Sequence, residues 1–198
     1  MESHLLYEKQ LTQGMFQVYS ACPPFAVKTV KQVHSDIVVP EKEANSEAEA
    51  DGIIGSSDSP LAVLTADCLP IVLMGKNLHA VIHAGWKGLQ NNILGDTQIK
   101  AMNPTHAFLG PHIRVHNYEV QTDFKKNFPG SHSFLADKDQ LFFDLTKEVT
   151  MQLKTFYPNI EISDCDICTF TNEHFASFRR NKTQKRNWNV FIPKGHLA

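Results

Sequence analysis

The sequence predicts a single α+β domain, in which helices cover a mixed, largely antiparallel sheet. Three observations support this prediction. Short apolar runs bounded by Gly, Pro, Asn or Asp dominate residues 25–83, and such runs are typical of strands. From residue 86 onward, apolar residues recur at helical spacing. No repeat or linker divides the 198 residues, so we expect one domain over 1–198.

The expected strands follow one another closely in the first half of the chain. They lie at 25–33, 36–39, 51–55, 61–67, 70–74 and 78–83. The segment MGKNLH at 74–79 is typical of a hairpin turn between the last two strands. Antiparallel pairing across this turn would bring Cys68, before one arm, close to His83, at the end of the other. The Glu-rich segment at 41–50 predicts an exposed loop or a short helix.

Helices are expected mainly in the second half. The segment 86–102 carries apolar residues near helical spacing, so AGW marks a turn from strand to helix. YEVQTDFKKNF at 118–128 predicts a second helix. A third should begin after Asp144, an N-cap residue followed by regularly spaced apolar residues. The remaining expected elements are two short strands and one helical turn, at 160–162, 188–192 and 173–180.

Composition excludes several classes of function. The net charge of -2 gives no reason to expect a nucleic-acid or membrane partner. The apolar runs are shorter than the roughly 20 residues of a membrane span. MESHLLYEKQ lacks the pattern of a signal peptide, so we expect a cytoplasmic protein. Four cysteines do not suggest a disulfide framework, and Cys165 and Cys168 are expected to be ordinary, partly buried thiols.

Three residues that can bind metal stand at strand ends. His34 ends the first expected strand, Cys68 follows LAVLTAD, and His83 closes LHAVI. Two His and one Cys are ligands that zinc prefers, and three protein ligands with one open position are typical of a catalytic zinc site. The three residues are far apart in sequence. Spacing alone therefore leaves open a second interpretation, in which each is an ordinary core or surface residue.

The motifs around these residues resemble, in order, those of the laccase-domain family. They are KQVHSDIVV, EADGIIG, LAVLTADCLPIVL, HAVIHAGWKGL, FLGPHI, YEV and CTFTNEHFASFRR, within residues 26–193. That family has been called multicopper polyphenol oxidases and peptidoglycan editing factors, and it is now regarded as purine nucleoside phosphorylases. The resemblance implies that His34, Cys68 and His83 bind one zinc ion. It also implies the family fold, which is held to resemble the catalytic domain of the deamidating cytotoxic necrotizing toxins.

The resemblance further implies a reaction. A zinc-dependent purine nucleoside phosphorylase converts adenosine, inosine, guanosine or methylthioadenosine and phosphate into free base and pentose 1-phosphate, and adenosine deamination is an additional family activity. The metal ligands His34, Cys68 and His83 are also the expected catalytic residues. The expected partners are a purine nucleoside and phosphate, and a homo-oligomer is compatible with the sequence. Zinc is preferred to copper because the sequence lacks the many-His pattern that several copper ions need.

Four further residues are candidates for substrate contacts. The AGWKG turn opens an expected helix, so its free N–H groups and Lys87 are candidates for binding phosphate. Arg179 and Arg180 form a second anion-binding candidate, although RRNKTQKR also suits a solvated basic loop. His112, beside a Gly-Pro turn, is either part of the pocket wall or a surface histidine. Asp51 in ADG is interpreted as a turn residue and is not included in the catalytic set.

Three alternative functions stay open. The first is a metal-free hydrolase in which Cys68 is the nucleophile and His83 the base. The second is a copper polyphenol oxidase, and the third is a degenerate binding module that keeps zinc for structure.

Two departures from the family motifs affect the substrate pocket rather than the metal ligands. The family's CCYEV is HNYEV here, with His116 and Asn117 in place of two Cys. The residues before 26 do not resemble the family's Asn- and Gly-containing segment, so the N-terminal part looks shortened. We therefore expect an intact metal site, slower turnover, and a pocket that is open or completed by a second chain.

Overall fold

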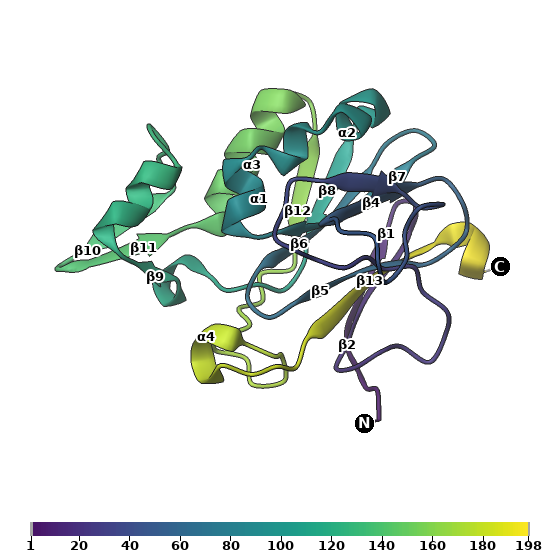
Figure 1. Ribbon diagram of the computed structural model, residues 1–198, viewed down its shortest axis with the longest axis horizontal. Coiled ribbons are helices and arrows are strands. Elements are labelled where there is room, and N and C mark those ends of the chain that lie inside the picture. Colours follow the sequence, from purple (N-terminus) through teal and green to yellow (C-terminus); the bar gives the residue numbers. More distant parts are fainter. Residues whose placement is uncertain (1, 198) are drawn as a thin grey trace.

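The chain folds into three layers, two β-sheets and a layer of helices, which confirms the expected α+β class (Figure 1). A computed structural model describes residues 2–197. One face of the central sheet packs against the second large sheet, and its other face packs against the helices. No helix within this described range is long and apolar enough to cross a membrane.

The central sheet has six strands in the order β12-β8-β6-β7-β4-β3. They are β3 (Val38–Pro40), β4 (Gly52–Gly55), β6 (Leu69–Met74), β7 (His79–Ala84), β8 (His106–Leu109) and β12 (Glu161–Asp164). Pairing is antiparallel inside the sheet and parallel at both edges, β3–β4 and β8–β12. The β6–β7 hairpin forms as expected and places Pro70 opposite His83. Cys68 and His83 therefore lie at one end of the sheet.

The second large sheet is antiparallel, in the order β1-β2-β13-β5. Its strands are β1 (Leu5–Leu11), β2 (Gly14–Tyr19), β5 (Leu61–Thr65) and β13 (Asn187–Pro193). The β1–β2 hairpin was not expected from the sequence. The strand predicted at 25–33 is wrong, because this segment makes only isolated bridges, from Lys28 to Leu61 and from Lys31 to Glu49. The segment bridges first to β5 and then to the loop before β4, and it becomes a regular strand in neither sheet.

Buried side chains fill both spaces between the layers. Between the two sheets, Phe16 and Phe191 pack with Phe108, and all three are almost completely buried. On the other face of the central sheet, Leu89 and Leu153 belong to a cluster that joins the sheet to the helices. Because both faces of the central sheet are covered, its inner strands β4, β6 and β7 are buried along their length, which explains their nearly continuous apolar runs in the sequence.

The helix predicted over 86–102 is divided into three short elements. They are α1 (Trp86–Gln90), the 3₁₀ turn η1 (Ile93–Gly95) and α2 (Thr97–Met102). The helix breaks because Asn92 adopts a left-handed φ of 62° and the Asp96 side chain caps a new helix by accepting a hydrogen bond from the Gln98 N–H.

The helix predicted after Asp144 is confirmed as α3 (Leu145–Phe156). The Asp144 carboxylate accepts a 2.9 Å hydrogen bond from the Lys147 N–H, which is N-cap geometry. The helix predicted over 118–128 forms only in part, and not as an α-helix. Its beginning is β9 (Glu119–Val120), and the rest is the 3₁₀ helix η3 (Thr122–Asn127).

β9 belongs to a small third sheet that projects from the body of the molecule (Figure 1). Its other strands are β10 (Phe134–Asp137) and β11 (Gln140–Phe143). Phe143 pairs with Phe134 on the neighbouring strand and stacks on Phe128 at 4.6 Å between ring centroids. This aromatic cluster packs η3 and the residue after it against the small sheet.

Three short elements complete the described chain: η2 (Val115–Asn117), α4 (Phe178–Asn181) and η4 (Lys194–Leu197). α4 overlaps the end of the helical turn expected at 173–180 and extends one residue beyond it. The Glu-rich segment at 41–50 is a loop, one of the two forms expected.

Candidate metal centre and its cavity

His34, Cys68 and His83 come together at one end of the central sheet. Their ligand atoms all lie within 4.8 Å of one another. The two imidazole rings meet edge to face, with 4.9 Å between their centroids. Donor atoms this close together could hold a single metal ion, and two His and one Cys are ligand types that zinc prefers.

His83 lies on β7, is 3% exposed, and is oriented by a residue that the sequence analysis excluded. Its Nδ1 atom is 2.6 Å from Oδ1 of Asp51, which is completely buried. The interpretation of Asp51 as a plain turn residue is therefore wrong. Because a carboxylate can only accept here, Nδ1 carries the proton and Nε2 is left for Cys68 or a metal. The signal in the sequence was an acidic residue immediately before a wholly buried strand.

The other two ligands depend on unusual backbone conformations. His34 has a φ of 60°, and Asp67, immediately before Cys68, has a φ of 93°. Positive φ values are uncommon for residues other than Gly, and they concentrate at functional sites. Gly85 passes close to the same point, since a Cβ atom there would lie 3.3 Å from His34 and 3.5 Å from the Cys68 sulfur. A side chain at residue 85 would therefore crowd the His34 ring.

Opposite charges stabilise one another within the centre. Burial alone would raise the pKa of the Cys68 thiol, but the charge of His83 and hydrogen bonds with His34 and His83 lower it to about 6. Burial opposes protonation of His83, but the Cys68 thiolate and the Asp51 carboxylate raise its pKa to about 9. The centre therefore favours a thiolate, the form of Cys that binds metals and acts as a nucleophile.

The three ligands line a cavity of about 500 Å³. The other lining residues come from the loop before β3, from β5 and from the C-terminal segment: Val30, Gln32, Leu64, Thr65, Ala66, Phe178 and Arg186. Gln32 fixes one wall, because its amide makes hydrogen bonds of 2.6 and 2.8 Å with the backbone of Leu64. Sequence reasoning missed Arg186, whose place in the cavity depends on the long-range pairing of β13 with β5.

A second, smaller cavity of about 120 Å³ lies on the other side of Cys68 and Phe178. Trp86, Tyr118 and Arg179 line it, and the same three residues continue into an outer groove of about 350 Å³. The guanidinium carbon of Arg179 is 5.0 Å from the centre of the Tyr118 ring. Phe178, with 44% of its surface exposed, thus lines both the metal cavity and the smaller cavity that opens into the aromatic groove.

Of the predicted substrate-binding residues, Arg179 lies beside the centre, whereas Lys87 and His112 do not line either cavity. Lys87 is exposed on α1, with its ammonium 5.7 Å from the centre of the Trp86 ring. α1 has only five residues, so its dipole offers little to an anion. His112 is completely buried, and its nitrogens lie 2.8 Å from the Gly110 carbonyl and from the Thr146 hydroxyl. These contacts hold the turn after Gly110 against the start of α3.

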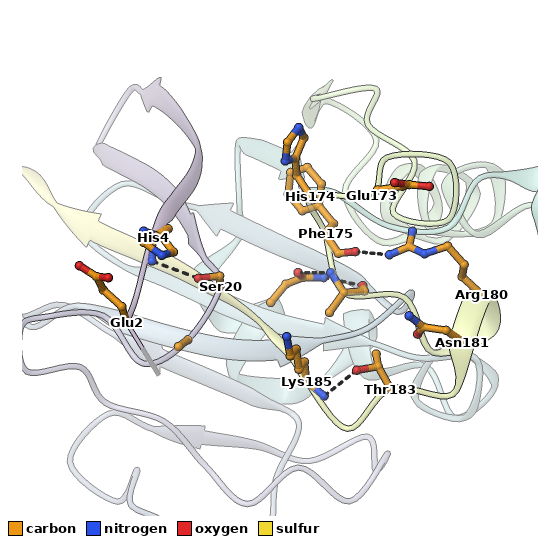
Figure 2. Close-up of a pocket in the computed structure, with 13 residues that line it drawn as sticks. Glu2, His4, Ser20, Glu173, His174, Phe175, Arg180, Asn181, Thr183 and Lys185 are labelled. Atoms are coloured by element: carbon orange, nitrogen blue, oxygen red, sulfur yellow. Dashed lines mark hydrogen bonds between the residues drawn. The ribbon is translucent and has the colours of Figure 1, made fainter.

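Arg180 points away from the metal centre and supports a loop. Its guanidinium donates hydrogen bonds to the carbonyls of Thr169 (2.7 Å), Phe170 (2.9 Å) and Phe175 (2.7 Å). Figure 2 shows the last of these contacts at a separate cavity of about 460 Å³ between the N-terminal strands and the loop 173–187. The two neighbouring Arg residues therefore face different cavities.

The cysteines of DCDIC are free and half-buried, as expected. Burial raises the pKa of Cys165 to about 11. The Cys168 sulfur accepts hydrogen bonds from the Arg114 N–H (3.4 Å) and from the Asn117 amide (3.5 Å). Asn117, one of the two departures from the family motif, thus contacts a thiol.

Known proteins resemble this chain over most of its length. A family model described as multi-copper polyphenol oxidoreductase laccase matches residues 12–192. A purine nucleoside phosphorylase of Campylobacter jejuni is 37% identical over 170 residues, covering 78% of this chain and 72% of that protein. A purine nucleoside phosphorylase of Aquifex aeolicus is 32% identical over 162 residues, covering 78% and 77%. These similarities confirm the resemblance carried by the motifs.

Solved structures share the fold. The Neisseria meningitidis protein NMB0706 superposes with a TM-score of 0.73 at 28% identity, covering 84% of this chain and 75% of that one. YlmD from Geobacillus stearothermophilus superposes with a TM-score of 0.74 at 22% identity, covering 84% and 73%, which is a likeness of fold alone.

Proposed function

Because this chain belongs to the multi-copper polyphenol oxidoreductase laccase family, we propose that it is a zinc-dependent purine nucleoside phosphorylase. The observation that carries the proposal is the convergence of His34, Cys68 and His83 at a cavity of about 500 Å³, within the usual size range of small-molecule sites. Relatives named purine nucleoside phosphorylase, such as those of Campylobacter jejuni and Aquifex aeolicus, support the reaction class. Adenosine, inosine, guanosine and methylthioadenosine are the proposed substrates.

The protein groups would each have a defined task. His34, Cys68 and His83 would hold zinc, which when bound supplies Lewis acidity and positions an anion or a water. Phosphorolysis joins a phosphate oxygen to C1′ of the ribose while the bond from C1′ to the purine nitrogen breaks and the base leaves. Arg186 lines the same cavity, and its Nη1 atom donates hydrogen bonds to the Thr183 and Lys185 carbonyls. We assign it to phosphate, because a guanidinium presents several donors to that anion.

The aromatic groove beyond Phe178 is the second half of the proposed substrate site. Trp86 and Tyr118 offer flat apolar surfaces of the kind that a purine ring stacks on, and Arg179 borders them. Deamination of adenosine, in which water replaces the amino group at C6, is a second reaction proposed for the same centre. Lys87, Arg180 and His112 lie outside both cavities and are weaker candidates for substrate contacts.

A metal-free hydrolase is the second candidate function, and one observation favours it. The lowered pKa of Cys68 and the raised pKa of His83 describe a thiolate beside an imidazolium, the arrangement of a cysteine nucleophile and its base. The two candidates differ in what occupies the thiolate. A stoichiometric metal on Cys68 is incompatible with its use as a free nucleophile.

We propose zinc rather than copper. Among residues 2–197, one group of His, Cys or carboxylate residues has ligand spacing, and it provides three ligands. Several copper ions would need more than three ligands.

The test combines metal analysis with a panel of nucleosides. Protein purified without chelators should contain about one zinc per chain and release base from inosine or adenosine only when phosphate is present. Equal base release without phosphate would replace phosphorolysis with hydrolysis. Full activity in metal-free protein would support the thiol hydrolase. Zinc without any turnover would support the binding-module interpretation.

A further inference from the structure

We propose that Asp51 is a positioning residue of the metal centre, which fixes the ring tautomer of His83 and the backbone of His34 at the same time. This inference rests on the proposed metal site but not on the proposed reaction. Asp51 is completely buried between the loop that carries His34 and the strand that carries His83. Its two carboxylate oxygens face these two ligands separately.

The first oxygen acts on His83. Oδ1 of Asp51 lies 2.6 Å from Nδ1 of that ring. A ring proton must lie on Nδ1 to make this bond, so Nε2, which faces Cys68, is the nitrogen left to bind a metal. The carboxylate therefore determines which nitrogen can bind a metal.

The second oxygen acts on the residues that flank His34. Oδ2 accepts hydrogen bonds from the Val33 N–H (3.2 Å), the Ser35 N–H (2.5 Å) and the Ser35 hydroxyl (2.8 Å). His34 is exposed and has a positive φ, so packing does little to hold its backbone in this conformation. The three hydrogen bonds to Asp51 clamp the loop on both sides of His34.

Asn at position 51 would keep the shape of the side chain, but it would have one acceptor oxygen instead of two. The backbone N–H groups of Val33 and Ser35 are obligatory donors, so the single amide oxygen must turn toward them. The amide NH₂ would then face His83 and donate to Nδ1. This moves the ring proton to Nε2, where it blocks the nitrogen that faces Cys68. Both oxygens of the carboxylate are therefore needed.

The test is cobalt titration of metal-free Asp51→Asn, followed by its thiolate-to-cobalt absorption and by competition with zinc. We expect metal affinity to fall by about 10- to 100-fold, while the melting temperature stays within a few degrees of wild type. Asp164→Asn is the matched control, because Asp164 pairs with Arg114 outside the metal centre. It should lower the melting temperature and leave cobalt affinity unchanged. Equal affinity in Asp51→Asn and wild type would overturn the inference.

A second measurement applies if Asp51→Asn does not fold. In zinc-loaded wild-type protein, imidazole ¹⁵N spectra should show the His83 proton on Nδ1, and a proton on Nε2 would overturn the positioning role. The two proposals fail differently. Wild-type protein that binds neither cobalt nor zinc refutes the metal centre itself, whereas an unaffected Asp51→Asn variant refutes only the role of Asp51.

Discussion

Oδ2 of Asp67 accepts a 2.6 Å hydrogen bond from the backbone N–H of Arg179. Its other oxygen accepts a 2.8 Å hydrogen bond from the Thr169 hydroxyl. Asp67 is buried and directly precedes Cys68, so one carboxylate fastens the C-terminal segment to the wall of the metal centre. The position of Phe178, which lines both cavities, depends on this attachment.

Removing the Asp67 carboxylate should loosen the substrate site without emptying the metal site. Asp67→Gly tolerates the positive φ but leaves two donors without a partner, at a cost of about 1–3 kcal/mol each if they stay buried. We expect the KM for nucleoside to rise about tenfold or more with zinc content unchanged. Asp67→Asn is the control, because its amide can bond both Arg179 and the Thr169 hydroxyl. Loss of zinc in Asp67→Gly, or an unchanged KM, would contradict this account.

Cys68→Ala should remove the metal. The thiolate is one of three protein ligands, so metal affinity should fall by more than the roughly 100-fold that loss of a supporting residue costs. Elemental analysis and cobalt titration measure the loss. Cys168→Ala removes a second half-buried thiol outside the ligand group and should retain zinc. Full zinc occupancy in Cys68→Ala would show that the three residues do not form the site.

Arg186→Ala should weaken phosphate binding specifically. Hydrogen bonds to a charged group contribute about 1.5–3 kcal/mol, so the KM for phosphate should rise about 10- to 100-fold while the KM for nucleoside changes less. Lys185→Ala removes the neighbouring exposed charge and should have little effect, because Lys185 borders the separate cavity of about 460 Å³. A similar rise in both variants would mean that general positive charge, rather than Arg186, attracts phosphate.

His112 should make the fold sensitive to mild acid. Its burial, reinforced by the charge of Arg114, lowers its pKa to about 4, whereas an unfolded histidine has a pKa of about 6.5. Between these values the unfolded chain binds the proton and the folded protein does not. The stabilising effect of neutral His112 is therefore complete above pH 6.5, and the free energy of unfolding falls by up to about 1.4 kcal/mol per pH unit toward pH 4.

Denaturant unfolding at several pH values between about 7 and 4.5 tests this prediction. His112→Asn keeps a nitrogen that can donate to the Gly110 carbonyl and has no group that titrates in this range. Its stability should be lower at pH 7 and should change less with pH than that of wild type. Parallel pH profiles for the two proteins would assign the acid sensitivity to other groups.

The sequence predicted the parts of the site that depend on local structure. The β6–β7 hairpin follows from a turn motif between two apolar runs, so the proximity of Cys68 and His83 could be expected. The role of Asp51 could not, because it depends on a contact with a residue 32 positions away. Arg186 reaches the cavity only because β13 inserts between β2 and β5. Neither the Asp51–His83 contact nor the position of β13 produces a periodic pattern in the sequence.

The position of β13 between β2 and β5 also has a consequence for the order of folding. The Asn189 amide donates to the Val63 carbonyl, 126 residues away in sequence, and β13 pairs with β2 over six residues. Contacts this distant form slowly, because a long loop must close before any of them contributes. During synthesis on the ribosome, β2 and β5 therefore expose unpaired edges until residues 187–193 emerge. Such edges bind other chains readily, so the nascent protein should depend on chaperones until its last strand arrives.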